Sequence, residues 1–298
     1  MNVASTHPTP PLAVGGPFQR ILVACALDEV GLWVVQRAAR LPLAPHARLE
    51  VLHVSPPWPP RRGHLTGAEA RGAMEEALAV AGHTAREVGH AQLQLVARAA
   101  EGWPAREIVR AAWRARAELI VVGPPATRLD GSPRATVARV LRWADLPVLV
   151  VRREPSGAYR RVLCAVDRTI TAAATVELTS RLAPSRPLTL FQAYHVPFEK
   201  WLGAAPDLEA EALEYLGELA RELAPVARVD RTTVLRGDRC VQIVRAAEAE
   251  RADLVVVGTR GRAGLARSLS ASAAQWVLAC APVDVAVARR HGLALSRE

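Results

Sequence analysis

The sequence has little cysteine, almost no lysine and no long apolar run. Its four cysteines, Cys25, Cys164, Cys240 and Cys280, form no C-x-x-C pair, which argues against a metal cluster or thioredoxin-like chemistry. No uncharged apolar stretch reaches the ~18–20 residues of a membrane helix. Residues 1–17 lack the basic segment and apolar core of a signal peptide. We therefore expect a soluble, cytoplasmic protein with no membrane partner.

Positive charge is abundant, and it comes almost entirely from arginine. The net charge is +9 and the pI about 10.5, although Lys200 is the only lysine. Such a balance suits an anionic partner: a nucleic acid, a phosphorylated ligand or an anionic membrane surface. The arginines are scattered along the chain without a long basic run, and their excess together with alanine is typical of GC-rich codon usage. This scatter argues against nucleic-acid binding.

The chain contains a long internal repeat. Ala117–Gly123 (AELIVVG) returns as Ala252–Gly258 (ADLVVVG), a shift of 135 positions, 258 − 123. Solenoid repeats have periods of only about 20–50 residues, so this repeat indicates a duplicated domain. A length of 298 residues also fits two domains. We expect a tail at 1–17, a first domain at 18–153, a linker at 154–158, a second domain at 159–290 and a tail at 291–298.

Short β-branched runs alternate with segments of helical spacing in both halves, which predicts parallel strands joined by right-handed helical crossovers. Strands are expected at 20–27, 48–54, 92–99, 118–122 and 147–151, and again at 161–166, 188–195, 226–235, 254–257 and 283–288. Helices are expected at 30–41, 67–89, 104–117 and 134–144, and at 172–182, 207–223, 239–251 and 270–279. Each half is therefore predicted to be a doubly wound α/β domain with a five-stranded parallel sheet. Ligands bind such sheets outside the carboxyl ends of the strands.

A glycine-rich loop follows one buried strand. Val257 leads into Gly258, Gly261 and Gly264, with Arg260 and Arg262 between them. Glycine lets the backbone approach a phosphate, and consecutive N–H groups before a helix form an anion site. The same composition also suits a plain tight turn. No Gly-Lys-Ser/Thr follows, so this is no Walker loop.

Here the chain resembles the universal stress protein family in a tandem form. Nucleotide-binding members carry G-x-x-G, nine residues, then G-S or G-T; this chain has Gly258-x-x-Gly261, nine residues, then Ala271-Ser272. Arg161–Asp167 (RVLCAVD) resembles the opening strand and its aspartate, and Ala281-Pro282-Val283 resembles the start of the last strand.

The resemblance implies a Rossmann-like fold of the adenine-nucleotide alpha-hydrolase type, with ATP, with or without Mg²⁺, bound in the second half. Asp167 would contact the nucleoside. The remaining residues of this implied site are Val166 and Val196 around the adenine, and Val257, Gly258, Gly261, Arg262, Ala271 and Ser272 around the phosphates. Ala271 departs from the family glycine and adds a methyl group near the phosphate.

The first half departs further. Pro124 and Pro125 remove two backbone N–H donors from its loop, and Ala126 replaces the second glycine. Thr136-Val137 replaces Ala271-Ser272. We expect no ATP binding of the family type in this half.

Several other residues have two readings each. Asp28 and Asp167 both follow the first strand of a half and suit either a ligand or a helix N-cap. His53 and His195 match each other in sequence and suit strand-end hydrogen bonds better than a metal, since no further ligand stands at metal spacing. Cys25 and Cys164, also at matching positions, are expected to be buried.

No catalytic constellation stands out, so we expect no enzyme, with slow ATP hydrolysis left open. The favoured hypothesis is a stress-response protein regulated by nucleotide and acting on an unidentified protein partner. The alternatives are an interaction module with both sites empty and a nucleotide-dependent enzyme. Family dimers pair through the last strand, so Val148–Val151 is expected to meet Val283–Val287 in a pseudo-dimer within one chain, which a second chain could join as a homodimer.

Overall fold

The fold was obtained as a computed structural model, which describes residues 15–55, 67–124, 135–168, 171–194, 207–224, 227–259 and 271–289. The first half contains strands β1 (Phe18–Ala24), β2 (Leu43–Ser55), β3 (Gln94–Glu101), β4 (Leu119–Val122) and β5 (Val148–Val150). Its helices are α1 (Glu29–Ala39), α2 (Gly67–Glu87), α3 (Pro104–Arg114) and α4 (Ala135–Trp143). This order is the predicted one.

The second half repeats the order. Its strands are β6 (Val162–Ala165), β7 (Leu188–Tyr194), β8 (Val229–Arg236), β9 (Leu254–Thr259) and β10 (Asp284–Arg289). Its helices are α5 (Ala172–Leu182), α6 (Leu208–Leu223), α7 (Arg239–Ala249) and α8 (Ala271–Cys280). Strand β2 starts earlier than expected, because Leu43 already pairs with Phe18 before a register shift that brings Arg48 beside Arg20.

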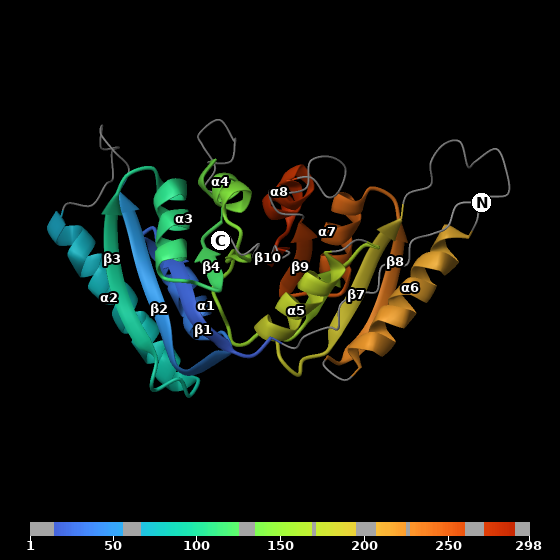
Figure 1. Cartoon of the computed structure of the whole chain (residues 1–298), viewed down its shortest axis with the longest axis horizontal. Helices are drawn as coiled ribbons and strands as arrows, with labels where there is room; N and C mark the ends of the chain where they lie inside the picture. Colours follow the sequence, from blue (N-terminus) through green and yellow to red (C-terminus); the bar gives the residue numbers. More distant parts are fainter. Residues whose placement is uncertain are drawn as a thin grey trace, which may run out of the picture.

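The two halves share one ten-stranded sheet, with strand order β3-β2-β1-β4-β5-β10-β9-β6-β7-β8 (Figure 1). Neighbouring strands within each half are parallel, whereas β5 and β10 are antiparallel. Leu149 pairs with Ala286 at the centre of this junction. The predicted meeting of the last strands is therefore confirmed, and the chain is a pseudo-dimer.

Helices cover both faces of the sheet. Strand β1 shows why: Ile21 and Val23 pack on one face and Leu22 on the other, because successive side chains point to opposite sides. Buried side chains of α1, α2, α5 and α6 belong to the first core layer, and those of α3, α4, α7 and α8 to the second. Both layers continue across the junction of the halves.

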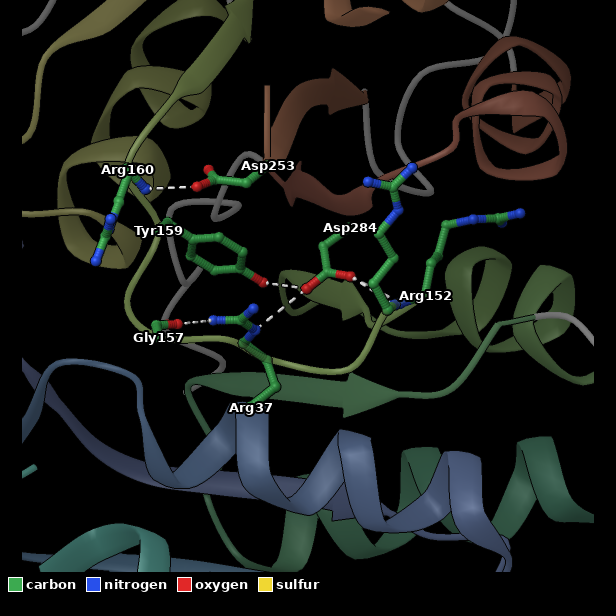
Figure 2. A network of polar contacts seen from close by, with 8 residues as sticks. Arg37, Arg152, Gly157, Tyr159, Arg160, Asp253 and Asp284 are labelled. Carbon is green, nitrogen blue, oxygen red and sulfur yellow. Dashed lines mark hydrogen bonds and ion pairs between the residues drawn. The ribbon is translucent and has the colours of Figure 1, made fainter. Parts of the chain in front are cut away.

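A buried polar network also joins the halves (Figure 2). The carboxylate of Asp284, at the start of β10, accepts hydrogen bonds from Arg37 Nε of α1 (3.2 Å), from the Tyr159 hydroxyl (2.7 Å) and from the backbone N–H of Arg152 (2.7 Å). Arg37 also donates to the carbonyl of Gly157 (2.7 Å), and its guanidinium lies 4.1 Å from the centre of the Tyr159 ring. Helix α1 is thereby tied to the connector and to the other half.

The second half makes an equivalent contact with the first half. Arg181, in the last turn of α5, stacks on Phe18 of β1 at 4.0 Å and forms an ion pair with Glu118. Phe18 and Tyr159 are equivalent, since each lies six residues before the end of the first strand of its half. Each half thus sends an arginine from its first helix onto the same aromatic position of the other half.

Candidate functional site

The carboxyl ends of β6 and β9 form a topological switch point in the second half. Strand β6 lies between β9 and β7, so the chain leaves β6 toward one side and later returns on the other. Ala165 pairs with Val257, which puts Val166 and Gly258 side by side one step further along. Ligands of doubly wound sheets bind in the crevice outside the carboxyl ends of the strands at such a point. The sequence prediction for Asp167 and Gly258 points to this place.

Asp167 follows β6 directly and is held from two sides. Its carboxylate lies 3.2 Å from Arg239 Nη1, and its backbone carbonyl accepts a hydrogen bond of 3.1 Å from the Tyr215 hydroxyl. The Asp167 side chain is 16% exposed and that of Arg239 44% exposed. Burial, together with the negative charge of Asp167, raises the pKa of Tyr215 to about 12. The hydroxyl therefore stays protonated and keeps donating at neutral pH.

Sequence reasoning missed Arg239. This arginine opens α7, after the N-cap residue Asp238. The repeat could have shown it, because Arg239 stands 135 positions after Pro104, which opens α3 in the first half. Arginine in place of proline brings a guanidinium beside the Asp167 carboxylate at the switch point of the second half. A carboxylate can accept from ribose hydroxyls, and a guanidinium binds phosphate with charge-assisted hydrogen bonds.

Gly258 is required by packing. A Cβ atom at this position would lie 2.4 Å from Thr175 Oγ1 and 2.8 Å from Thr171 Oγ1 at the start of α5. At Gly123, the counterpart in the first half, the nearest atom is Val34 Cγ2 at an ordinary 3.5 Å. The glycine at 258 therefore has a structural cause whether or not a phosphate lies beside it.

The other expected site residues fall into three groups. Val166 and Val257 are buried in the two core layers below the strand ends. Ala271 and Ser272 open helix α8, whose N-terminus follows the glycine loop. Val196, Gly261 and Arg262 lie outside the described residues. The structure thus brings the described strand-end residues together at one edge of the sheet.

The first half differs at the position of the aspartate. Its strand register makes Cys25 the counterpart of Val166, because Cys25 N–H donates to Leu52 O just as Val166 N–H donates to Phe191 O. Ala26 then takes the place of Asp167. Asp28 instead caps α1 by accepting from Gly31 N–H at 2.7 Å. The N-cap interpretation is confirmed for Asp28, and the first half has alanine where the second half has Asp167.

The same register corrects two sequence matches. Cys25 and Cys164 are both buried as expected, but they are not equivalent, since Cys164 lies two positions before Val166. His53 corresponds to Gln192, one residue after the paired Leu52 and Phe191, and not to His195, which lies outside the described residues. His53 Nδ1 donates to the carbonyl of Cys25 at 3.0 Å, the strand-end hydrogen bond that was expected.

Within the described part of the chain, no group of three or more His, Cys, Asp or Glu side chains is placed to hold a metal ion. No helix in the same part is long and apolar enough to cross a membrane.

Comparison with known proteins agrees with this architecture. A functionally unknown protein from Pseudomonas aeruginosa PAO1 has a similar structure, with 20% identity and a TM-score of 0.63 over 91% of this chain and 92% of its own. A universal stress protein from Archaeoglobus fulgidus DSM 4304 is similar at 18% identity and a TM-score of 0.63, over 92% of this chain and 99% of its own. These likenesses show a shared fold. No curated protein gave a significant match.

The family assignment rests on the sequence itself. The sequence model of the universal stress protein family matches residues 17–152 and, a second time, residues 158–289. Together the two matches cover both halves of the sheet. The chain therefore belongs to the universal stress protein family and carries two copies of its domain in tandem.

Proposed function

We propose that the second half binds an adenine nucleotide, ATP, at the carboxyl ends of β6 and β9, and that the protein uses this site for regulation during stress and not for catalysis. The observation that carries the proposal is the Asp167–Arg239 pair, 3.2 Å apart at the switch point beside the start of the glycine loop. The first half has alanine and proline at these two positions, Ala26 and Pro104.

The pair suggests how nucleotide would act. In the described structure Arg239 neutralises Asp167. A bound nucleoside would take over the carboxylate, and the exposed guanidinium would then be available to a phosphate oxygen. Because Arg239 belongs to the first turn of α7, binding would alter what holds this helix to β6. A ligand that prefers one arrangement shifts the population toward it, and a protein partner can recognise that difference.

Calorimetric titration with ATP tests the site. Asp167→Asn is expected to weaken ATP binding by about tenfold or more, since loss of one charge-assisted hydrogen bond costs about 1.5–3 kcal/mol. Asp28→Asn is the matched control, because Asp28 caps a helix in the first half and lies outside the proposed site. Equal affinities of Asp167→Asn and the unchanged protein would refute the assignment. Mass spectrometry of the purified protein would identify any nucleotide carried through purification.

The second candidate is an interaction module that binds no nucleotide. It is favoured by Ala271 in place of the family glycine and by an Asp167 that already has a charged partner. Under this alternative, ATP shows no saturable binding to the full chain, and Asp167→Asn changes nothing but stability. The titration therefore separates the two candidates.

A further inference from the structure

One layer of helices carries an unusual set of exposed tryptophans. Trp103, Trp113, Trp143 and Trp276 are 62%, 80%, 39% and 39% exposed. All four lie on or next to α3, α4 and α8, which cover the same face of the sheet. Large aromatic side chains are normally buried in part, and exposed ones that gather on one surface mark interaction sites.

The outward face of α3 consists of arginine and tryptophan. Ala105, Ile108, Ala111 and Ala112 are the buried residues of this helix. An exposed stripe of arginines lies opposite them, formed by Arg106, Arg110 and Arg114. Successive arginines are four residues, or about 6 Å, apart along the helix axis. Trp113 lies beside the end of this stripe, and Trp103 lies at its start.

Helix α4 packs beside α3 and extends this surface (Figure 1). Its exposed side chains include Arg139, Arg142 and Trp143. We call the eight exposed arginines and tryptophans of α3 and α4 the Arg–Trp face. The one acidic residue within the two helices is Glu107, which is half-buried and lies 4.0 Å from Arg110. Within α3 and the described part of α4, the exposed charge is entirely positive.

The Arg–Trp face belongs to the first half alone. At the repeat distance of 135 positions, α7 has Asp238 in place of Trp103 and Glu248 in place of Trp113. Arg106 and Arg114 become Val241 and Ala249. Arg110 is the one member of the stripe with a counterpart, the exposed Arg245. The scaffold that the two helices share therefore does not account for the other arginines and the tryptophans of α3.

We propose that the Arg–Trp face binds single-stranded nucleic acid. Arginines neutralise backbone phosphates, and exposed aromatic rings give bases a surface on which to stack. An acidic peptide would use the arginines but leave the tryptophan rings uncovered. A helix that lies in a lipid surface needs a free apolar face to bury there, and the apolar face of α3 is already buried against the sheet. The proposal is independent of the nucleotide site in the second half.

The scatter of the arginines along the sequence argued against nucleic-acid binding, but the folded chain brings some of them together. Residues four apart stand on one face of a helix, so three arginines spread over nine positions form a continuous stripe. Two more come from α4, which follows strand β4 in the chain. The fold therefore gathers five arginines from two separate segments onto one surface.

Fluorescence anisotropy with a short fluorescein-labelled oligo(dT) tests the proposal on the full chain; thymine avoids the proposed adenine site. Binding is expected to weaken with salt, with a log–log slope of up to about −3.5 for five arginines. Arg110→Gln with Arg114→Gln should lower the slope by about 1.4. The control is Arg221→Gln, which removes an exposed arginine of α6 on the opposite layer and should leave affinity and slope unchanged.

Three variants of Trp113 separate stacking from simple hydrophobic contact. Loss of one stacked base is expected to weaken binding about 5-fold to 150-fold in Trp113→Ala and in Trp113→Leu, whereas Trp113→Phe should keep most of the affinity. Oligo(dT) affinity that is unchanged in Trp113→Ala and in the double arginine variant would overturn the proposal. So would binding to phosphatidylserine vesicles without binding to oligo(dT), because the surface would then recognise lipid.

Discussion

At the scale of single residues, the three tyrosines of the chain each donate a hydrogen bond to a different acceptor. Tyr159 donates to the buried Asp284, Tyr194 to Glu209 on the surface (2.9 Å), and Tyr215 to the backbone of Asp167. The pKa of Tyr159 is raised well above its usual value by burial and by Asp284, and that of Tyr194 is raised mainly by its hydrogen bond to Glu209. The ionisation of Tyr159 therefore reports on the buried network between the halves, that of Tyr194 on a surface contact, and that of Tyr215 on the candidate nucleotide site.

Alkaline titration followed at 295 nm should resolve these environments. Tyr194 is expected to ionise first, Tyr215 near pH 12, and Tyr159 only when the protein unfolds. Tyr215 has its folded pKa above the unfolded value of ~10, so the unfolded chain loses its proton first as the pH rises. Its contribution to stability is present below pH ~10 and is lost between pH ~10 and about 12. A native step of all three tyrosines near pH 10 would contradict these contacts.

The two aspartates show what a residue's place in the sequence does not reveal. Asp28 and Asp167 each follow the first strand of a half, and both suited a cap or a ligand contact. The structure makes one a cap and leaves the other against Arg239, because α1 starts four residues after Cys25 whereas α5 starts six residues after Val166. A change of loop length decided the role, and neither aspartate's immediate neighbours encode it.

At the scale of elements, the order of strands and helices could be predicted because buried parallel strands are short β-branched runs and the helices have clear periodicity. The β5–β10 junction could also be predicted, from the family resemblance. The equivalences of Cys25 and His53 could not, since strand register depends on pairing partners far away in sequence. The repeat singles out Arg239 against Pro104, but its contact with Asp167 could not be predicted, since 72 residues separate the two.

Gly258→Ala tests the close approach between β9 and α5. The added methyl group must displace Thr175 Oγ1, and we expect a loss of about 1–3 kcal/mol in the free energy of unfolding, as for overpacked cores. Gly123→Ala is the matched control. A Cβ atom at this position would make only ordinary contacts, and the backbone angle φ of Gly123 is not positive. Urea unfolding of both variants measures the difference. Equal stabilities would show that the threonines of α5 move aside without cost.

At the scale of the whole molecule, the two halves are joined by a short antiparallel strand pair, by continuous core layers and by the reciprocal arginine–aromatic contacts. The polar part of this junction is unequal. On one side Arg37 reaches the buried Asp284, whereas on the other Arg181 reaches the less buried Glu118. Burial raises the pKa of Asp284, and the Arg37 guanidinium and the backbone N–H groups offset part of that effect. The loss of a partner is therefore expected to cost more on the side that holds Asp284, since a buried charge would be left without compensation.

Removal of this carboxylate should weaken the whole chain. Asp284→Ala leaves Arg37 as an uncompensated buried charge and Tyr159 without its acceptor, and we expect a loss of about 3–5 kcal/mol in the free energy of unfolding. Asp284→Asn keeps one carbonyl oxygen and should lose less. The control is Asp230→Ala, which breaks the exposed pair with Arg228 and should cost at most about 1 kcal/mol. If urea unfolding gave Asp284→Ala and Asp230→Ala the same stability, the pairing of β5 with β10 and the shared core would hold the halves together without help from the polar network.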